Sequence, residues 1–111
     1  MAERIYKTWG TREKLHQDDL SETYILDLNP NQRCSYHNHD AKSNFFYVID
    51  GALTVKTEWG KVDLGAGESF TVHPPDMHEF STGTERTTII EIAYVKLRPD
   101  DINRETIGGP I

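Results

Sequence analysis

His37 and His39, two histidines separated by one residue, are the side chains of this sequence best suited to bind a metal. We expect Ser35–His39 to be a β-strand, and alternate side chains of a strand leave the same face, so both imidazoles would point the same way. A third histidine, His78, follows the turn Pro74-Pro75. Imidazole nitrogens suit Zn, Fe, Ni, Cu or Mn. The alternative is a pair of solvated surface histidines.

The residues around these histidines form a longer pattern. Asn44 follows His39 by five residues, Gly51 comes seven residues later, and Gly67 precedes His78 by eleven. This arrangement resembles the two motifs of the cupin superfamily. The resemblance implies an all-β fold, a single small jelly-roll β-barrel whose strands direct the three histidines at one interior point. It also implies a divalent transition metal, Zn, Mn, Fe or Ni, as cofactor.

Asn44 stands where this family usually carries a glutamate. An amide offers only a neutral carbonyl oxygen, so it binds a dication more weakly than a carboxylate does and leaves the charge unbalanced. Asn44 would therefore be either a distant fourth metal ligand or a residue that orients a water beside the metal. A site of histidines alone keeps the full 2+ charge, which favours anionic or ionisable ligands.

Short runs of strand-forming residues, separated by turn signals, occupy most of the chain. This pattern predicts a β-sandwich or a closed barrel. Arg12–Asp19 is the only candidate for a helix. Asp50-Gly51 predicts a β-hairpin, because glycine accepts the positive φ of a tight turn. The predicted strands are Glu22–Leu28, Ser35–His39, Phe45–Ile49, Leu53–Thr57, Lys61–Leu64, Ser69–His73, His78–Ser81 and Thr87–Lys96.

Length and composition limit the class of protein. With 111 residues the chain predicts one domain over residues 1–111, with looser ends near 1–4 and 99–111. A net charge of −6 without a Lys/Arg cluster argues against nucleic acid and anionic membranes as partners. The single cysteine, Cys34, excludes an internal disulfide, and we expect it to pack facing away from the histidines. Without an apolar run of ~20 residues or a signal sequence, we expect a cytoplasmic protein.

Several segments narrow the family resemblance and span nearly the whole chain. They are Trp9-Gly10, Leu26-Asp27-Leu28-Asn29-Pro30-Asn31-Gln32, Ile89-Ile90-Glu91-Ile92 and Asp100-Asp101-Ile102-Asn103-Arg104. These segments are similar to the cupin domain of type II mannose-6-phosphate isomerases. That resemblance implies isomerisation of a sugar phosphate or another polar sugar. Ser35 replaces a glutamine that is common in this family.

Aldose–ketose isomerisation moves a proton between neighbouring carbons and needs a base. The candidates by residue type are Glu91, His73, Tyr36 and Glu79, and spacing does not choose among them. The cations available for a phosphate are Arg33, Lys42, Lys56 and Arg104.

Two other functions fit the same residues. Histidines without a carboxylate also suit an iron oxygenase that acts on a small molecule. A cupin that binds a small molecule without catalysis is the third possibility. In each case we expect a homodimer, because a barrel of this size leaves apolar strands that need covering. The candidate contacts are Ile5–Trp9 and the face that carries Ile89 and Ile92.

Overall fold

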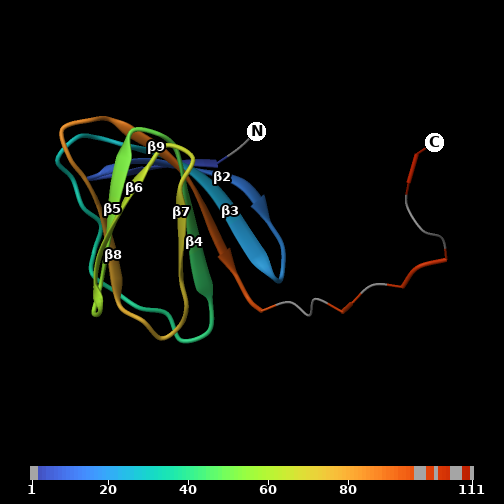
Figure 1. Cartoon of the computed structure of the whole chain (residues 1–111). Helices are drawn as coiled ribbons and strands as arrows, with labels where there is room; N and C mark the ends of the chain where they lie inside the picture. The colour runs from blue at the N-terminus through green and yellow to red at the C-terminus, as the bar shows by residue number, and fades with distance from the viewer. Residues whose placement is uncertain (1–2, 97–99, 102, 106–108, 111) are drawn as a thin grey trace.

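The computed structural model describes residues 3–96, 100–101, 103–105 and 109–110, and its regular elements are all β-strands (Figure 1). The strands are β1 (Glu3–Lys7), β2 (Gly10–Gln17), β3 (Ser21–Leu28), β4 (Ser43–Asp50), β5 (Ala52–Thr57), β6 (Gly60–Gly65), β7 (Ser69–Val72), β8 (His78–Thr82) and β9 (Thr87–Tyr94). Within the described residues no helix has the length and apolarity that crossing a membrane requires. The predicted all-β class is confirmed.

Two antiparallel sheets share one core. The larger has the strand order β1-β2-β3-β9-β4-β7 and the smaller β6-β5-β8, and Figure 1 shows the smaller standing across from the larger. Strand alternation builds the core, since every second residue of β3 from Tyr24 on is buried. Leu26 of β3, Ile89 of β9 and Val55 of β5 are all fully buried within it. The small barrel that the turn pattern predicted is thus formed by two facing sheets.

The predicted strand Ser35–His39 is wrong, because this segment lies in the irregular connection between β3 and β4. This connection runs beside β8 of the small sheet, with isolated bridges from Arg33 to Ser81 and from His37 to His78 and a hydrogen bond from the Cys34 N–H to the Phe80 carbonyl. At the second bridge the His37 N–H donates to the His78 carbonyl at 3.0 Å, and the reverse bond is 2.8 Å long. Backbone pairing with β8, rather than strand alternation, therefore positions the histidines of this loop.

The predicted helix over Arg12–Asp19 is also wrong, because most of this segment is strand β2. β2 pairs with β1 on one side and with β3 on the other. In that register Arg12 lies opposite Leu26, whose side chain is buried. Pairing along both edges outweighs the weak helical propensity of a short charged segment.

The Asp50-Gly51 turn has the predicted backbone but a different role. Gly51 has φ +94°, as a tight turn requires. The hairpin prediction is wrong, since β4 pairs with β7 and β9 whereas β5 pairs with β6 and β8. The turn instead carries the chain from one sheet to the other, and the Thr87 hydroxyl anchors it through the N–H and carbonyl of Ala52.

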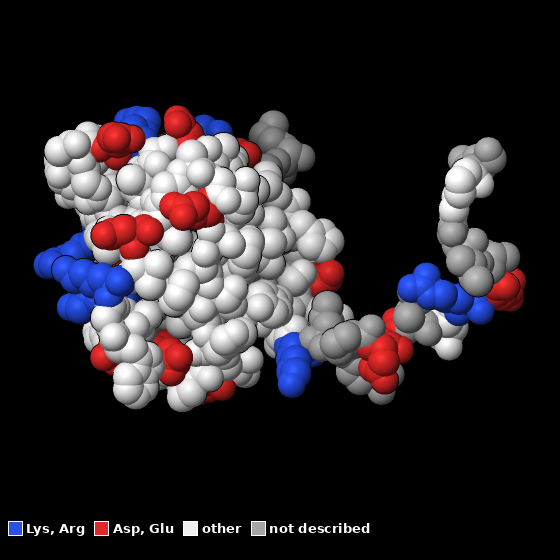
Figure 2. Space-filling view, in the orientation of Figure 1, with Lys and Arg blue, Asp and Glu red and all other residues white. Residues whose placement is uncertain are grey.

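The outer surface bears on the expected dimer contacts. Ile89 is fully buried in the core, so it does not share an exposed face with Ile92. Figure 2 shows charged side chains mainly around the edges of the face in view, with few in its middle.

The looser ends near 1–4 and 99–111 stay a prediction, because much of both segments lies outside the described residues and Glu3 and Arg4 are paired in β1.

Candidate metal centre

The fold brings His37, His39 and His78 together, although two come from a loop and one begins β8. One ligand nitrogen from each lies within 4.8 Å of the other two. The ring centroids are 4.5 Å apart for His37 and His78, 5.0 Å for His37 and His39, and 5.5 Å for His39 and His78. This cluster could hold one metal ion, as the motif pattern predicts.

Hydrogen bonds orient two of these rings. The Nδ1 atom of His37 lies 2.8 Å from the Ser35 carbonyl oxygen, and that of His78 lies 3.3 Å from the Asp76 carbonyl oxygen. A carbonyl only accepts, so each Nδ1 carries the proton and each Nε2 keeps its lone pair. The His78 Nε2 atom is buried without a hydrogen-bond partner among the described residues. A buried acceptor without a partner is costly, and a metal ion would satisfy it.

Burial favours the neutral, metal-binding form of His78 and of His39. Desolvation, with His37 and His39 nearby, lowers the pKa of His78 to about 4. Desolvation and the neighbouring Lys42 ammonium also lower the pKa of His39. The donor set therefore fits a divalent transition metal in its charge state as well as in its geometry.

Asn44 and Glu91 form a hydrogen-bonded pair on neighbouring strands of the same wall. Asn44 is 3% exposed, and its Nδ2 donates to Glu91 Oε2 at 3.1 Å. This bond directs the amide nitrogen to the carboxylate, and the Asn44 Oδ1 atom is left buried without a hydrogen-bond partner in the described part of the chain. Burial raises the pKa of Glu91, against the opposing effects of Arg12 and of the Asn44 bond. Asn44 can thus serve a metal or its water through Oδ1 while it holds Glu91 in place.

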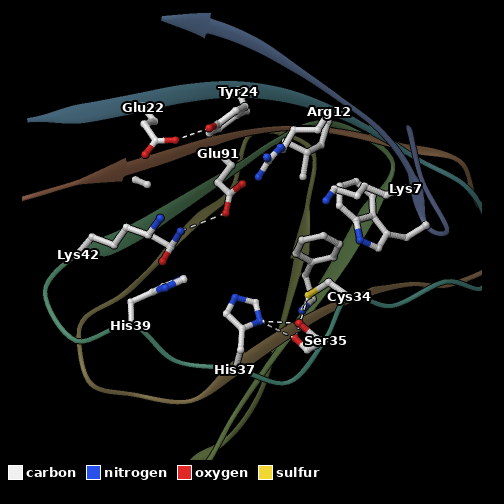
Figure 3. A pocket seen from close by; sticks show the side chains of 15 residues that line it. Lys7, Arg12, Glu22, Tyr24, Cys34, Ser35, His37, His39, Lys42 and Glu91 are labelled. Carbon is white, nitrogen blue, oxygen red and sulfur yellow. Dashed lines mark hydrogen bonds between the residues drawn. The ribbon is translucent and has the colours of Figure 1, made fainter. Parts of the chain in front are cut away.

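These groups surround a cavity of about 230 Å³ between the two sheets. Figure 3 shows His37 and His39 on one side, with Glu91 and Arg12 facing them. His78 is buried beside this wall, in ring contact with both histidines. The lining residues are Lys7, Trp9, Arg12, Glu22, Tyr24, Leu26, Cys34, Ser35, His37, His39, Lys42, Asn44, Phe80, Glu91 and Ala93. The cavity has room for a small polar molecule.

Of the predicted bases, only Glu91 lines this cavity. His73 is exposed and its Nδ1 lies 3.1 Å from the Ser43 hydroxyl. Tyr36 is 41% exposed, with the Lys56 ammonium 5.2 Å from its ring. Glu79, on β8, is not among the lining residues either. Of the predicted cations, Lys42 lines the cavity, whereas Arg33, Lys56 and Arg104 do not.

Cys34 does not face away from the histidines as predicted, because it lines the same cavity. It still packs against the core, and its sulfur accepts the Phe80 N–H at 3.2 Å. Burial raises the pKa of this thiol to about 11, so the thiol is a packing group rather than a nucleophile at neutral pH.

The structure adds cavity residues that the sequence interpretation missed. Arg12 lies with its guanidinium carbon 4.3 Å from the centre of the Tyr24 ring, and the Tyr24 hydroxyl donates to the Glu22 carboxylate. Lys7 enters from β1. Residues 10–17 show no alternation of apolar and polar residues that would identify Arg12 as a strand residue facing the cavity.

Comparisons with known proteins agree on the fold. Residues 24–93, more than half of the chain, match the model of the cupin domain family. KdgF from Halomonas sp. has a TM-score of 0.76 at 18% identity, over 92% of this chain and 93% of that chain. A cupin-superfamily sugar phosphate isomerase from Silicibacter pomeroyi has a TM-score of 0.73 at 16% identity, over 86% and 72%. Oxalate decarboxylase of Bacillus subtilis, which has Mn(II) centres, has a TM-score of 0.75 at 16% identity, over 85% of this chain and 27% of its own. No curated protein matches the chain significantly in sequence.

Proposed function

Because this chain belongs to the cupin domain family, we propose that its histidine cavity binds a divalent transition metal and isomerises a sugar or sugar phosphate. The observation that carries the proposal is the position of Glu91. This carboxylate lines the same cavity as His37 and His39 and is held there by the Asn44 amide. The likeness to a sugar phosphate isomerase and the resemblance to mannose-6-phosphate isomerase support this substrate class.

The histidines His37, His39 and His78 would hold the metal through nitrogen lone pairs, with Asn44 Oδ1 nearby as a fourth oxygen donor or as a partner for a water. A bound divalent metal polarises a substrate oxygen and stabilises negative charge that develops on it. Glu91 would take a proton from the hydroxyl-bearing carbon beside the carbonyl and return it to the former carbonyl carbon, while the proton of that hydroxyl passes to the former carbonyl oxygen. The Asn44 N–H keeps one carboxylate oxygen in place and leaves the other free for the proton.

The test begins with metal analysis of protein purified without added metal. Turnover of mannose 6-phosphate to fructose 6-phosphate is then measured in a coupled assay. Glu91→Gln should reduce turnover roughly 100-fold or more with unchanged metal content, because general-base catalysis typically contributes that much. Glu79→Gln is the matched control, since Glu79 does not line the cavity. Equal activity of both variants would contradict the role of Glu91.

The amide at position 44 favours a second candidate, an iron oxygenase, because a metal held by neutral ligands alone matches such a centre. The two functions differ in their metal. Tightly held Fe(II) with substrate-dependent uptake of O₂ would support the oxygenase, whereas Zn or Mn with sugar-phosphate turnover supports the isomerase. Binding without turnover or O₂ uptake would leave a small-molecule-binding cupin.

A further inference from the structure

The cavity wall opposite His37 carries two positively charged side chains, Lys7 and Arg12. Figure 3 shows Lys7 and Arg12 entering the cavity from that side. Within residues 3–96, no carboxylate forms an ion pair with Lys7 or with Arg12. The Nε–H of Arg12 is buried and has no hydrogen-bond partner in the same part of the chain. A buried donor of this kind marks a place where a ligand acceptor is missing.

Each of the two carboxylates that line the cavity accepts a hydrogen bond from a side chain other than Arg12. Glu22 accepts the Tyr24 hydroxyl, and Glu91 accepts the Asn44 amide. The Arg12 guanidinium is instead fixed by its position over the Tyr24 ring, at 4.3 Å from the ring centre. Stacking on an aromatic ring holds the planar guanidinium in one orientation while its edge stays available. Arg12 is thus held in one orientation with its Nε–H unpaired within residues 3–96, although its charge also acts on the Glu91 carboxylate.

We propose that Arg12, assisted by Lys7, binds a carboxylate or phosphate group carried by the ligand, while the rest of the ligand extends toward the histidines. A guanidinium matches both groups because its parallel N–H donors bind two of their oxygens. Lys7 is exposed at the edge of the cavity and adds a mobile point charge. The proposal rests on the proposed function in one respect, since it takes the histidine cavity as the ligand site. It narrows the substrate class to sugars or sugar-like molecules that carry an oxyanion.

The test measures binding to protein kept free of metal with EDTA, so that its result does not depend on the metal. Three probes share one ring: mannose, mannose 6-phosphate and mannuronate. Trp9 lines the cavity and supplies a fluorescence signal, and calorimetry gives an independent dissociation constant. We expect an anionic probe to bind roughly tenfold or more tightly than mannose, as charge-assisted hydrogen bonds allow. The phosphate and carboxylate probes distinguish the two sources of the oxyanion.

Arg12→Met should abolish the preference for the anionic probe, and Lys7→Met should reduce it. Arg12→Lys keeps the positive charge but lacks the parallel N–H donors of a guanidinium, so it should bind the anion more weakly than the wild type. It also keeps the test valid if Arg12→Met does not fold. Arg33→Met is the matched control, because Arg33 is exposed and lies outside the cavity. Equal binding of all probes by the wild type, no binding of either anion, or an unchanged preference in the Arg12 variants would overturn the proposal. Loss of metal or turnover with the anion preference intact would instead overturn only the proposed function.

Discussion

Replacing Asn44 by aspartate tests the pairing of Asn44 with Glu91 most directly. The two side chains have the same shape, but the change converts an N–H donor 3.1 Å from Glu91 Oε2 into a charged oxygen. Two unit charges at that separation repel by about 5 kcal/mol at an effective dielectric constant of about 20. Protonating one carboxyl at pH 7.5 costs less, about 4 kcal/mol for an ordinary pKa near 4.5. The pair should therefore take up one proton, as closely spaced carboxylates do.

The sign of the pH dependence follows from this proton. The folded pair has a pKa above that of the unfolded carboxyls, so its stability is fully present below the unfolded pKa and is lost as the pH rises toward the folded pKa. In EDTA, Asn44→Asp should lower the free energy of unfolding by up to about 4 kcal/mol at pH 7.5 and by much less at pH 4.5. Urea denaturation at both pH values measures this difference.

Asn38→Asp is the matched control. This amide is exposed and donates to the Pro75 carbonyl at 3.1 Å, so the same substitution removes a bond of equal length without placing two carboxylates together. If Asn44→Asp loses the same free energy at both pH values, the reasoning is refuted. In a separate experiment, adding a divalent metal should restore the stability of Asn44→Asp and release the shared proton, because a carboxylate at this position offsets the charge of a dication. A metal affinity equal to that of the wild type would place Asn44 outside the coordination sphere.

Four further outcomes are expected. Alanine in place of any one of the three clustered histidines should strongly reduce bound metal measured by elemental analysis, whereas His16→Ala should not, because His16 is exposed near the end of β2. Because its pKa is raised to about 11, native Cys34 should react with iodoacetamide at pH 8 roughly 100-fold more slowly than in urea, and equal rates would contradict its burial. Ile49→Lys should convert the expected homodimer to a monomer in sedimentation, because Ile49 is 43% exposed on the large sheet, and Trp59→Lys in the small-sheet turn should not. Gly51→Ala should cost about 2 kcal/mol or more in urea denaturation, since its Cβ would lie 2.5 Å from the Thr87 hydroxyl at a positive φ.

Strand alternation made much of the fold predictable from sequence. The run from Tyr24 to Leu28 alternates buried and partly buried residues in the structure, as its sequence pattern indicates. The segments that were mispredicted lack that signal. β2 is rich in charged residues, and its strand conformation depends on pairing with β1 and β3. Residues 35–39 contain no aliphatic residue, and the structure ties them to β8 by a single bridge at His37. Pairing partners distant in sequence decided both cases.

The candidate site likewise contains residues that the sequence predicts and residues that only the structure reveals. The histidines could be predicted because their spacing follows a motif, whereas Glu91 was one of several bases suggested by residue type alone. The role of Asn44 toward Glu91 could not be predicted, since it depends on β4 and β9 being neighbours with Asn44 opposite Ala93. Arg12 was missed for a related reason. Its side chain faces the cavity only because the register of β2 places it opposite Leu26, which a single sequence does not reveal.

The origin of the cavity residues has a consequence for function. His37, His39, His78 and Glu91 all lie within residues 24–93, the part that matches the cupin domain family. Lys7 and Arg12 precede that part and come from β1 and β2. The family core thus supplies the groups suited to metal binding and proton transfer, and the N-terminal strands supply the groups suited to an anion. Solved structures that share 16–18% identity with this chain show its fold alone, so its ligand must be inferred from the residues that line its own cavity, including those of β1 and β2. Exchanging these two strands with another cupin should change the anion preference while the histidines keep their metal.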